Sequence, residues 1–540
     1  MGYRRISMGV IATALLALPF QEVRADSAPK VVEEVDFAIS CGQTSQTAFK
    51  HAVWTLHSFW YPEALKEFTA IAAAEPGCAM AYWGIAMSHW YPLWYPPGPA
   101  ALKAGSEAVA KAMAAPTKTP READYIAAIA AFYRDNDKLD HQTRAVAYEK
   151  AMEQVYQRYP DDREAAVFYA LALNASALKT DKTFANQRKA AEILNKIWKE
   201  EPNHPGVVHY LIHSDDSPQL AAAGLDAAIC YSKIAPDVPH ALHMPSHIFT
   251  RLGLWQQSID SNRAAHAAAL DYVHKSLAPG GYDMETLHTM DYLEYAYLQI
   301  AQDGSAKAVV DELIGFRQSK DATLPAAYAV AAIPVRYALE RRDWSAAAAL
   351  SEPAIGFPLE RFPWAEAMIA YARALGDAHT GNIAGTQAEI DRLQSLEDKL
   401  KGQDTYWANQ VEVQRLAAAG ILANVQGDGK KAVALVRAAA DLDATMDKHP
   451  ATPSSVLPAR ELLADLLLEL NQPAAALVEY RTMLHTDPNR FRSLLGEARA
   501  AKQTGDAAVA QDAYRKLVTL SHPDGSLRPE LAEARASATD

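Results

Sequence analysis

The sequence predicts an all-α fold in which antiparallel helix hairpins stack into a solenoid. From about Thr47 onward, apolar residues recur three and four positions apart, with short breaks at Pro, Gly and Asp, and strand-like alternation is hard to find. A weak unit of about 34 residues also recurs along the chain. Finally, 540 residues, of which 50% are apolar, exceed what a single compact core usually holds. Together these observations favour a repeat architecture over one globular core.

The chain begins with the three parts of a secretory signal. Tyr3-Arg4-Arg5 is a short basic region, Ile6–Phe20 is an apolar run, and Val23-Arg24-Ala25 fits a small-x-small cleavage site. The apolar run is too short for a comfortable membrane span, and no later stretch reaches the roughly 18 apolar residues that a span needs. We therefore expect a signal peptide over 1–25. The mature protein would begin near Asp26 and be periplasmic or secreted, without a membrane span.

The sequence holds three cysteines, and an exported protein meets an oxidising compartment that permits a disulfide. Cys41 and Cys78 border the first predicted hairpin, so we expect these two to pair. Cys230 lies in an Ala-rich predicted helix, where we expect a buried small apolar side chain rather than a ligand or nucleophile.

The repeating unit has small residues at two places, a large apolar or aromatic residue after the second, and a proline at its end. The small residues let two helices approach closely, the aromatic fills the gap between hairpins, and the proline ends the second helix. The positions that fit this frame are Ala52, Ala64, Phe68 and Pro76, then Gly84, then Ala190, Leu194, Ile197 and Pro202, and finally Ala464, Ala476, Tyr480, Met483, Pro488 and Gly496.

These positions resemble the tetratricopeptide repeat (TPR) family, which implies a right-handed superhelix of antiparallel helix hairpins. More narrowly, four segments resemble a group of exported bacterial tetratricopeptide proteins that largely lack an assigned activity. The segments are His57-Ser-Phe-Trp-Tyr-Pro-Glu-Ala64, Cys78-Ala-Met-Ala-Tyr-Trp-Gly84, His209-Tyr-Leu-Ile-His213 and His240-Ala-Leu-His243-Met-Pro-Ser-His247-Ile-Phe-Thr-Arg-Leu-Gly253. The resemblance implies a fold and a compartment, and it does not imply a reaction.

The frame divides the mature chain into five parts. We expect an N-terminal segment over 26–44, TPR-like repeats over 45–200, histidine-rich TPR-like repeats over 201–300, further TPR-like repeats over 301–520, and a flexible tail over 521–540.

The histidine-rich part holds nine of the 17 histidines. Many are spaced three or four residues apart, so that on a helix they project from one face. Neutral imidazole is a common ligand of zinc, copper, nickel and iron. The three helical sets are His209 with His213, then His240, His243 and His247, then His288 with Asp291.

The repeat frame places these three sets on successive first helices, which line the concave surface of such a solenoid. Pro202 and Pro236 each end a unit, and Met284–Gln299 reads as the first helix of the following one. Adjacent helices lie about 10 Å apart, a gap that two imidazoles can bridge. Pro245 either kinks its helix or occupies the first position of a new one.

We therefore predict a transition-metal site in the concave groove. His209, His213, His243 and His247 form its nucleus, with His240, His288 and Asp291 as further ligands or as residues that orient the ligands. Because seven candidates exceed the needs of one tetrahedral ion, either some orient the others or two metals bind. A nearly all-nitrogen set favours zinc or copper, with nickel or iron behind.

The charge of the sequence and the motifs it lacks argue against several other functions. A net charge of -13 without a Lys/Arg run argues against nucleic-acid binding. The sequence lacks a His-Glu-x-x-His motif, a Cys-x-x-Cys-His haem site, a phosphate-binding glycine loop and a Gly-x-Ser-x-Gly elbow. Three classes remain open: a metal-dependent enzyme, a metal carrier or store, and an interaction module whose groove binds a protein or peptide.

Five arginines lie on or near predicted first helices. They would either meet an anionic ligand or pair with neighbouring acids, and the sequence favours pairing for each one singly. They are Arg251, Arg336, Arg460, Arg490 and Arg492.

Overall fold

The computed structural model describes residues 35–93, 96–178, 180–276, 281–319, 322–524 and 528–538. The chain divides into two units, residues 1–32 and 33–540, and every described residue belongs to the second. The predicted signal peptide over 1–25 therefore lies outside the described residues. Among the described residues, no helix combines the length and the apolar character that a membrane crossing requires.

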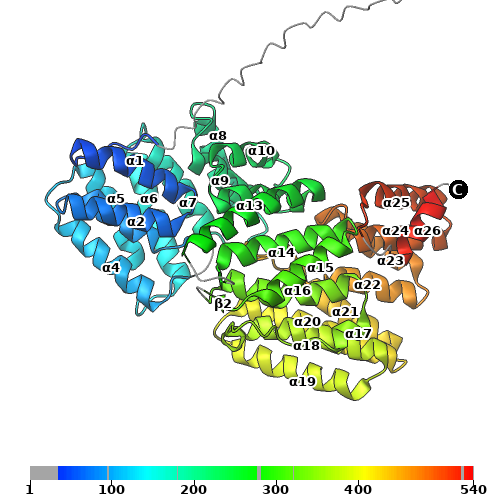
Figure 1. Ribbon diagram of the computed structural model, residues 1–540. Helices are drawn as coiled ribbons and strands as arrows, with labels where there is room; N and C mark the ends of the chain where they lie inside the picture. Colours follow the sequence, from blue (N-terminus) through cyan, green and yellow to red (C-terminus); the bar gives the residue numbers. More distant parts are fainter. Residues whose placement is uncertain are drawn as a thin grey trace, which may run out of the picture. The chain divides into compact units, whose positions relative to one another are not determined.

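The second unit is an all-α, TPR-like α-solenoid, and its hairpins follow one another in the order of the sequence (Figure 1). The N-terminal hairpins are built from α1 Gln43–His57, α2 Tyr61–Ala74, α3 Ala79–Ser88, α4 Pro99–Ala114, α5 Pro120–Tyr133, α6 His141–Arg158, α7 Arg163–Ser176 and α8 Ala185–Trp198.

The histidine-rich helices come next. They are α9 Pro205–Asp215, α10 Leu225–Ile234, α11 Pro239–His243, α12 Pro245–Arg251, α13 Trp255–Ser276 and α14 Met284–Gln299. The longest of them, α13, packs against α11, α12 and α14. Two short strands, β1 Gly281–Tyr282 and β2 Gln318–Ser319, pair in parallel beside them.

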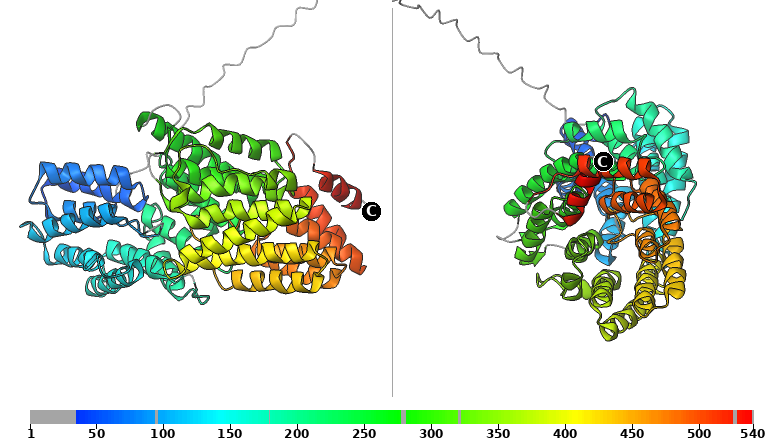
Figure 2. Two further views of the ribbon diagram at one scale, coloured as in Figure 1. Left: turned by 90° about the horizontal axis from the view of Figure 1, so that it is seen from below. Right: turned by 90° about the vertical axis from the view of Figure 1, so that its right-hand side faces the viewer.

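The C-terminal helices complete the unit, and successive pairs lie side by side (Figure 2). They are α15 Asp303–Gly315, α16 Leu324–Glu340, α17 Trp344–Ala348, the 3-10 helix η1 Leu359–Arg361, α18 Pro363–Thr380, α19 Ile383–Leu400, α20 Thr405–Val425, α21 Gly429–Asp443, α22 Ala459–Glu469, α23 Pro473–Thr486, α24 Phe491–Thr504, α25 Ala507–Leu520 and α26 Pro529–Ala538.

Helix starts in this unit are marked by the residue types that cap helices. The Thr119 side chain and Glu122 form a reciprocal capping box at α5. Asp140, Asp283 and Asp404 each accept a hydrogen bond from the backbone N–H three residues on, at the starts of α6, α14 and α20. These caps satisfy N–H groups that the first turn of a helix leaves without an intrahelical partner.

Close helix approach depends on the small residues of the repeat, as the sequence predicts. A Cβ on Gly84 would lie 2.3 Å from Phe68, and one on Gly496 would lie 2.1 Å from Tyr480. Each aromatic ring thus fills the space above a glycine, and the paired helices pack at a distance that a larger residue would not allow.

The first helices of successive hairpins contact one another as well as their own partners. Helices α14, α16, α18, α20, α22 and α24 form one such row, and α7, α9 and α12 form another. In addition, α1 contacts α9 across more than a hundred intervening residues. This return contact brings the N-terminal hairpin against the first histidine helix.

The tail needs a correction. The segment 521–540 is predicted to be flexible, but its helix α26 packs on α25 and buries Leu531. The buried guanidinium of Arg528 donates hydrogen bonds to both carboxylate oxygens of Asp303 and to the carbonyl of Leu298. The segment has few apolar residues, which is why the sequence predicts flexibility. The ion pair between Arg528 and Asp303 nevertheless holds it in place.

Cys41 and Cys78 form a disulfide with Cα atoms 5.4 Å apart, which confirms the predicted pairing. Cys230 is free and half-buried, so it is less buried than predicted. We expect the Cys41→Ala, Cys78→Ala double variant to lose about 3 to 4 kcal/mol of unfolding free energy, because the bridge closes a long loop. Urea unfolding checks this against Cys230→Ser, which keeps the bridge. A loss no larger than in that control would contradict it.

Candidate metal centre

The first histidine helix is positioned by the return contact between α1 and α9. The Nδ1–H of His209 donates a 2.6 Å hydrogen bond to the backbone carbonyl of His57, the last residue of α1. The His57 ring in turn accepts a 2.9 Å hydrogen bond at Nδ1 from the hydroxyl of Tyr210. The ring of His209 therefore has a fixed orientation, with its Nε2 lone pair directed away from α1.

Three imidazoles meet at that lone pair, and we call them the first trio: His209, His213 and His240. The Nε2 atom of His209 lies 3.1 Å from Nε2 of His213 and 3.1 Å from Nε2 of His240. The three ligand atoms lie within 4.8 Å of one another. His209 and His213 come from adjacent turns of α9, as predicted, and His240 comes from α11.

The second trio consists of His243, His247 and His288, from α11, α12 and α14. Its ligand atoms also lie within 4.8 Å of one another, and Nε2 of His243 is 3.0 Å from Nε2 of His247. Met244, the single residue between α11 and α12, keeps helical backbone angles. Pro245 is thus the first residue of a new helix, and the two histidines remain on adjacent turns.

The proton positions in the second trio follow from its neighbours. Asn262 donates from its Nδ2 to the carbonyl of Ser258 at 2.7 Å, so its oxygen is the atom that faces His243. That oxygen lies 2.6 Å from Nδ1 of His243, which must therefore carry the proton. The Nε2 atom of neutral His243 accordingly presents a lone pair to His247.

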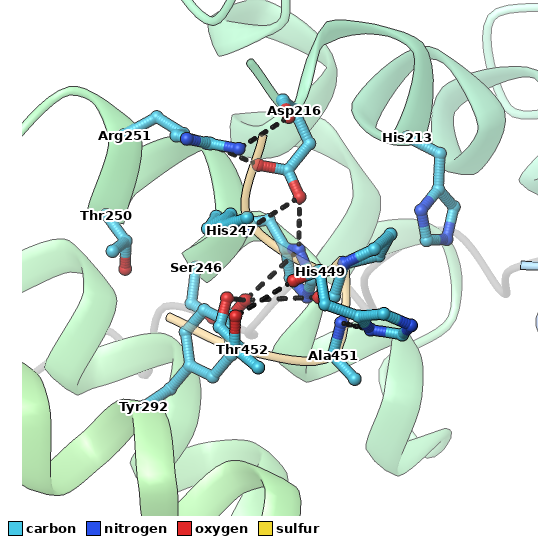
Figure 3. Close-up of polar contacts among 12 residues, drawn as sticks. His213, Asp216, Ser246, His247, Thr250, Arg251, Tyr292, His449, Ala451 and Thr452 are labelled. Carbon is cyan, nitrogen blue, oxygen red and sulfur yellow. Dashed lines mark hydrogen bonds and ion pairs between the residues drawn. The ribbon is translucent and has the colours of Figure 1, made fainter. Parts of the chain in front are cut away.

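His247 is oriented by a carboxylate in the same way. Its Nδ1–H donates a 2.9 Å hydrogen bond to Oδ2 of Asp216, and Arg251 lies 2.9 Å from the same carboxylate (Figure 3). Lys448 lies 3.2 Å from that carboxylate. Burial raises the pKa of Asp216, but Lys448, Arg251 and His247 outweigh burial and hold that pKa well below its ordinary value. Asp216 is therefore an anion, and His247 also presents its Nε2 lone pair to His243.

Two lone pairs consequently face each other at 3.0 Å in the second trio. A proton between them would require an imidazolium, yet burial lowers the pKa of His243 well below its ordinary value and that of His247 to about 4. A cation other than a proton fits this contact. Ligand nitrogens of tetrahedral zinc lie about 3.3 Å apart, since zinc–nitrogen bonds are about 2.0 to 2.1 Å long.

The two trios share a small cavity. It has a volume of about 10 Å³, which is enough for about one water molecule. The residues that line it are His213, His240, Met244, His247 and His288, together with Leu93, Pro450 and Ala451. The residues 450 and 451 belong to the loop between α21 and α22, which the hydroxyl of Tyr292 holds by donating to the carbonyl of Thr452 at 2.9 Å.

The trios are more enclosed than the sequence predicts. All six histidines except His213 are buried, whereas the sequence analysis places them on the open surface of a groove. The reason is that α1 covers one side and the loop between α21 and α22 covers another, and neither contact is visible in the helical spacing.

The predicted nucleus also divides differently. The pairs His209/His213 and His243/His247 form as expected, but they belong to separate trios that His240 and His288 complete. Asp291 is in neither trio, because its carboxylate pairs with the buried guanidinium of Arg336. Burial raises the pKa of Asp291, and the cation of Arg336 opposes that rise.

A third group of possible ligands is not among the site residues predicted from the sequence. The buried carboxylate of Glu164 accepts hydrogen bonds from Nε2 of His57 at 2.8 Å and from Nε2 of His204 at 2.9 Å. The other ring nitrogens accept from Tyr210 and from the N–H of Val207. Since every nitrogen already has a partner, this group holds α1, α7 and α9 together rather than a metal. The sequence held one signal for this group, because His57 belongs to the segment His57-Ser-Phe-Trp-Tyr-Pro-Glu-Ala64 that resembles the exported tetratricopeptide proteins.

A larger pocket lies on the other side of the same loop. Its volume is about 440 Å³, and Arg251 and Lys448, which contact Asp216, are part of its wall. Tyr328, Tyr406 and Trp407 provide an aromatic side. The pocket is of a size that holds a small organic ligand, and it is separated from the trios by the chain between Lys448 and Thr452.

Comparison with known proteins adds little to this geometry. No family model and no curated protein matches the chain. Among solved structures, a human IFIT1 dimer with PPP-AAAA covers 87% of this chain and 89% of its own at 11% identity and a TM-score of 0.36. A structure of Naa15/Naa10 bound to HypK-THB covers 92% and 91% at 10% identity and a TM-score of 0.23. At these values neither protein informs the function of this chain.

Proposed function

We propose that this is an exported TPR-solenoid protein that binds a transition metal, zinc or copper, in its six-histidine cluster. The single observation that carries the proposal is the 3.0 Å contact between the Nε2 lone pairs of His243 and His247. Two neutral imidazoles in these tautomers repel each other, and a bound cation turns the repulsion into shared coordination. The orienting contacts from Asn262 and Asp216 are those that metal-ligating histidines usually have.

We further propose metal-dependent chemistry on a small or peptide-like substrate. A bound ion with an open position polarises a carbonyl or activates water. The cavity that the trios share has room for one such water, and the 440 Å³ pocket lies across the chain between Lys448 and Thr452. Asp216, held as an anion by Arg251 and Lys448, links the wall of that pocket to the ring of His247.

The proposal is tested by adding metal to the apo-protein. At a free zinc or copper concentration a hundred times the Kd, binding stabilises the fold by about 2.7 kcal/mol, seen as a higher midpoint of urea unfolding. Calcium and magnesium should give no such shift, because they prefer oxygen ligands. If no transition metal raises the midpoint, an interaction scaffold without a metal is the reading that survives. Turnover by the loaded protein then separates an enzyme from a metal carrier.

Export is proposed on the sequence signal alone and has its own test. The protein isolated from its host should have the intact mass of a chain that begins near Asp26. The compartment also agrees with the Cys41–Cys78 disulfide, since such bonds persist in oxidising surroundings. A full-length chain recovered from the cytoplasm would overturn this part of the proposal.

A further inference from the structure

Each trio by itself supplies three protein ligands, the number that an ion with one open position needs. The three nitrogens of either trio converge within 4.8 Å, but the trios form separate groups. Rings of different trios lie 6.2 Å apart for His213 and His247 and 6.3 Å apart for His240 and His243. These separations place the trios side by side.

A single ion would leave the other trio with an unresolved contact. If the first trio alone were filled, His243 and His247 would still oppose lone pairs at 3.0 Å. If the second alone were filled, the one in-plane lone pair of His209 would face two Nε2 atoms at 3.1 Å, although it accepts only one hydrogen well. Filling both trios removes both problems.

The charge around the cluster indicates which ion fits. The six ligands are neutral, and two divalent ions would bring four positive charges into a buried site. Asp216 already pairs with Arg251 and Lys448. Glu285 is 3.6 Å from Nδ1 of His240 and adds one negative charge. Because buried charge without compensation is costly, a pair of monovalent ions is favoured over a pair of divalent ones.

Copper(I) is a monovalent transition ion that thioether ligands select and that imidazole also binds. The cavity between the trios is lined by the side chain of Met244, which is fully buried and carries a thioether. The same cavity is bordered by two histidines of each trio and admits one water-sized group.

We propose that the cluster holds a pair of copper ions, one in each trio, and that the cavity between them binds one small anion that contacts both. This inference rests on the proposed metal-binding function and specifies its metal, its stoichiometry and its ligand. On oxidation each copper(I) ion gives one electron to the added oxidant, and an anion such as hydroxide or fluoride in the cavity offsets part of the added charge.

The test uses the full mature protein, stripped of metal and loaded with copper(I) without oxygen. We expect two copper ions per chain, retained in the presence of equimolar zinc. Ferricyanide then removes one electron from each copper. Two bridged copper(II) ions couple, so the EPR signal should account for only a small fraction of the copper, and fluoride, which is close to water in size, should change the optical spectrum.

Variants of each trio make the pairing visible as a gained signal. His209→Ala in the first trio and His288→Ala in the second should each bind one copper ion that shows its full EPR intensity after oxidation. The exposed His274→Ala serves as the matched control and should behave as wild type. Because an unfolded chain with histidines can also bind copper(II), each variant is first shown by circular dichroism to keep the helical content of the wild type.

The outcomes separate the inference from the proposal beneath it. One copper per wild-type chain with full EPR intensity overturns the copper pair and leaves a single transition-metal site in place. Zinc displacing copper from both trios overturns copper as the metal and leaves transition-metal binding in place. A wild-type chain that binds neither metal overturns both.

Discussion

Replacing His243 with alanine is expected to lower the affinity of the second trio for zinc or copper by more than about a hundredfold, beyond the 10- to 100-fold cost of losing an orienting partner. His243 supplies one of three nitrogens, and its Nε2 faces that of His247 at 3.0 Å. Without it the trio has two ligands, too few to hold an ion tightly. Competition with a chelator of known affinity measures the change.

Two further variants grade that result. Asn262→Ala removes only the group that orients His243, so we expect a loss of about 10- to 100-fold. His274→Ala changes an exposed histidine outside both trios and should leave affinity unchanged. Helical content by circular dichroism should remain close to wild type, because each repeat packs chiefly on its neighbours. Equal affinity in all three variants would refute the assignment of these ligands.

The second large effect concerns Arg490, whose replacement by methionine is expected to cost about 3 to 5 kcal/mol of unfolding free energy. Its guanidinium is fully buried and donates to Glu461 at 2.7 Å, to Glu340, and to the hydroxyl of Tyr295 at 3.1 Å. These partners come from α22, α16 and α14. The variant leaves Glu340 buried without its cation and Glu461 with only the more distant Arg342, 3.7 Å away, and urea unfolding measures the loss.

A surface ion pair provides the matched comparison. Arg515 is exposed and lies 3.7 Å from Asp512 on the same helix. Arg515→Met should change the unfolding free energy by less than about 1 kcal/mol, since water screens an exposed pair. A cost for Arg490→Met no greater than for Arg515→Met would mean that the buried network adds nothing to stability.

The arginines show how far sequence reasoning reached. The sequence favours pairing with neighbouring acids over anion binding for each of the five arginines. Arg336 and Arg490 are indeed paired with acids and fully buried. Their partners could not be named, because Arg490 joins a helix 150 residues away through Glu340. Repeat period and apolar spacing predicted the hairpins, since both are set by local helix geometry.

The candidate site was predicted only as far as helical spacing allows. The pairs His209/His213 and His243/His247 follow directly from adjacent turns. The grouping into trios depends on contacts between helices, through which His240 joins the α9 pair and His288 joins the pair of α11 and α12, and the spacing does not contain these contacts. Asp216, Asn262 and the carbonyl of His57 orient the ligands from loops and distant helices, so no local pattern indicates them.

The central claim is that the six-histidine cluster is a transition-metal centre. Elemental analysis of the wild-type protein purified from its host, without added metal or chelator, tests it most directly. We expect roughly one or two ions of zinc or copper per chain, and proportionally less in His243→Ala. Wild-type protein with no transition metal, both as purified and after loading with zinc or copper, would contradict the claim.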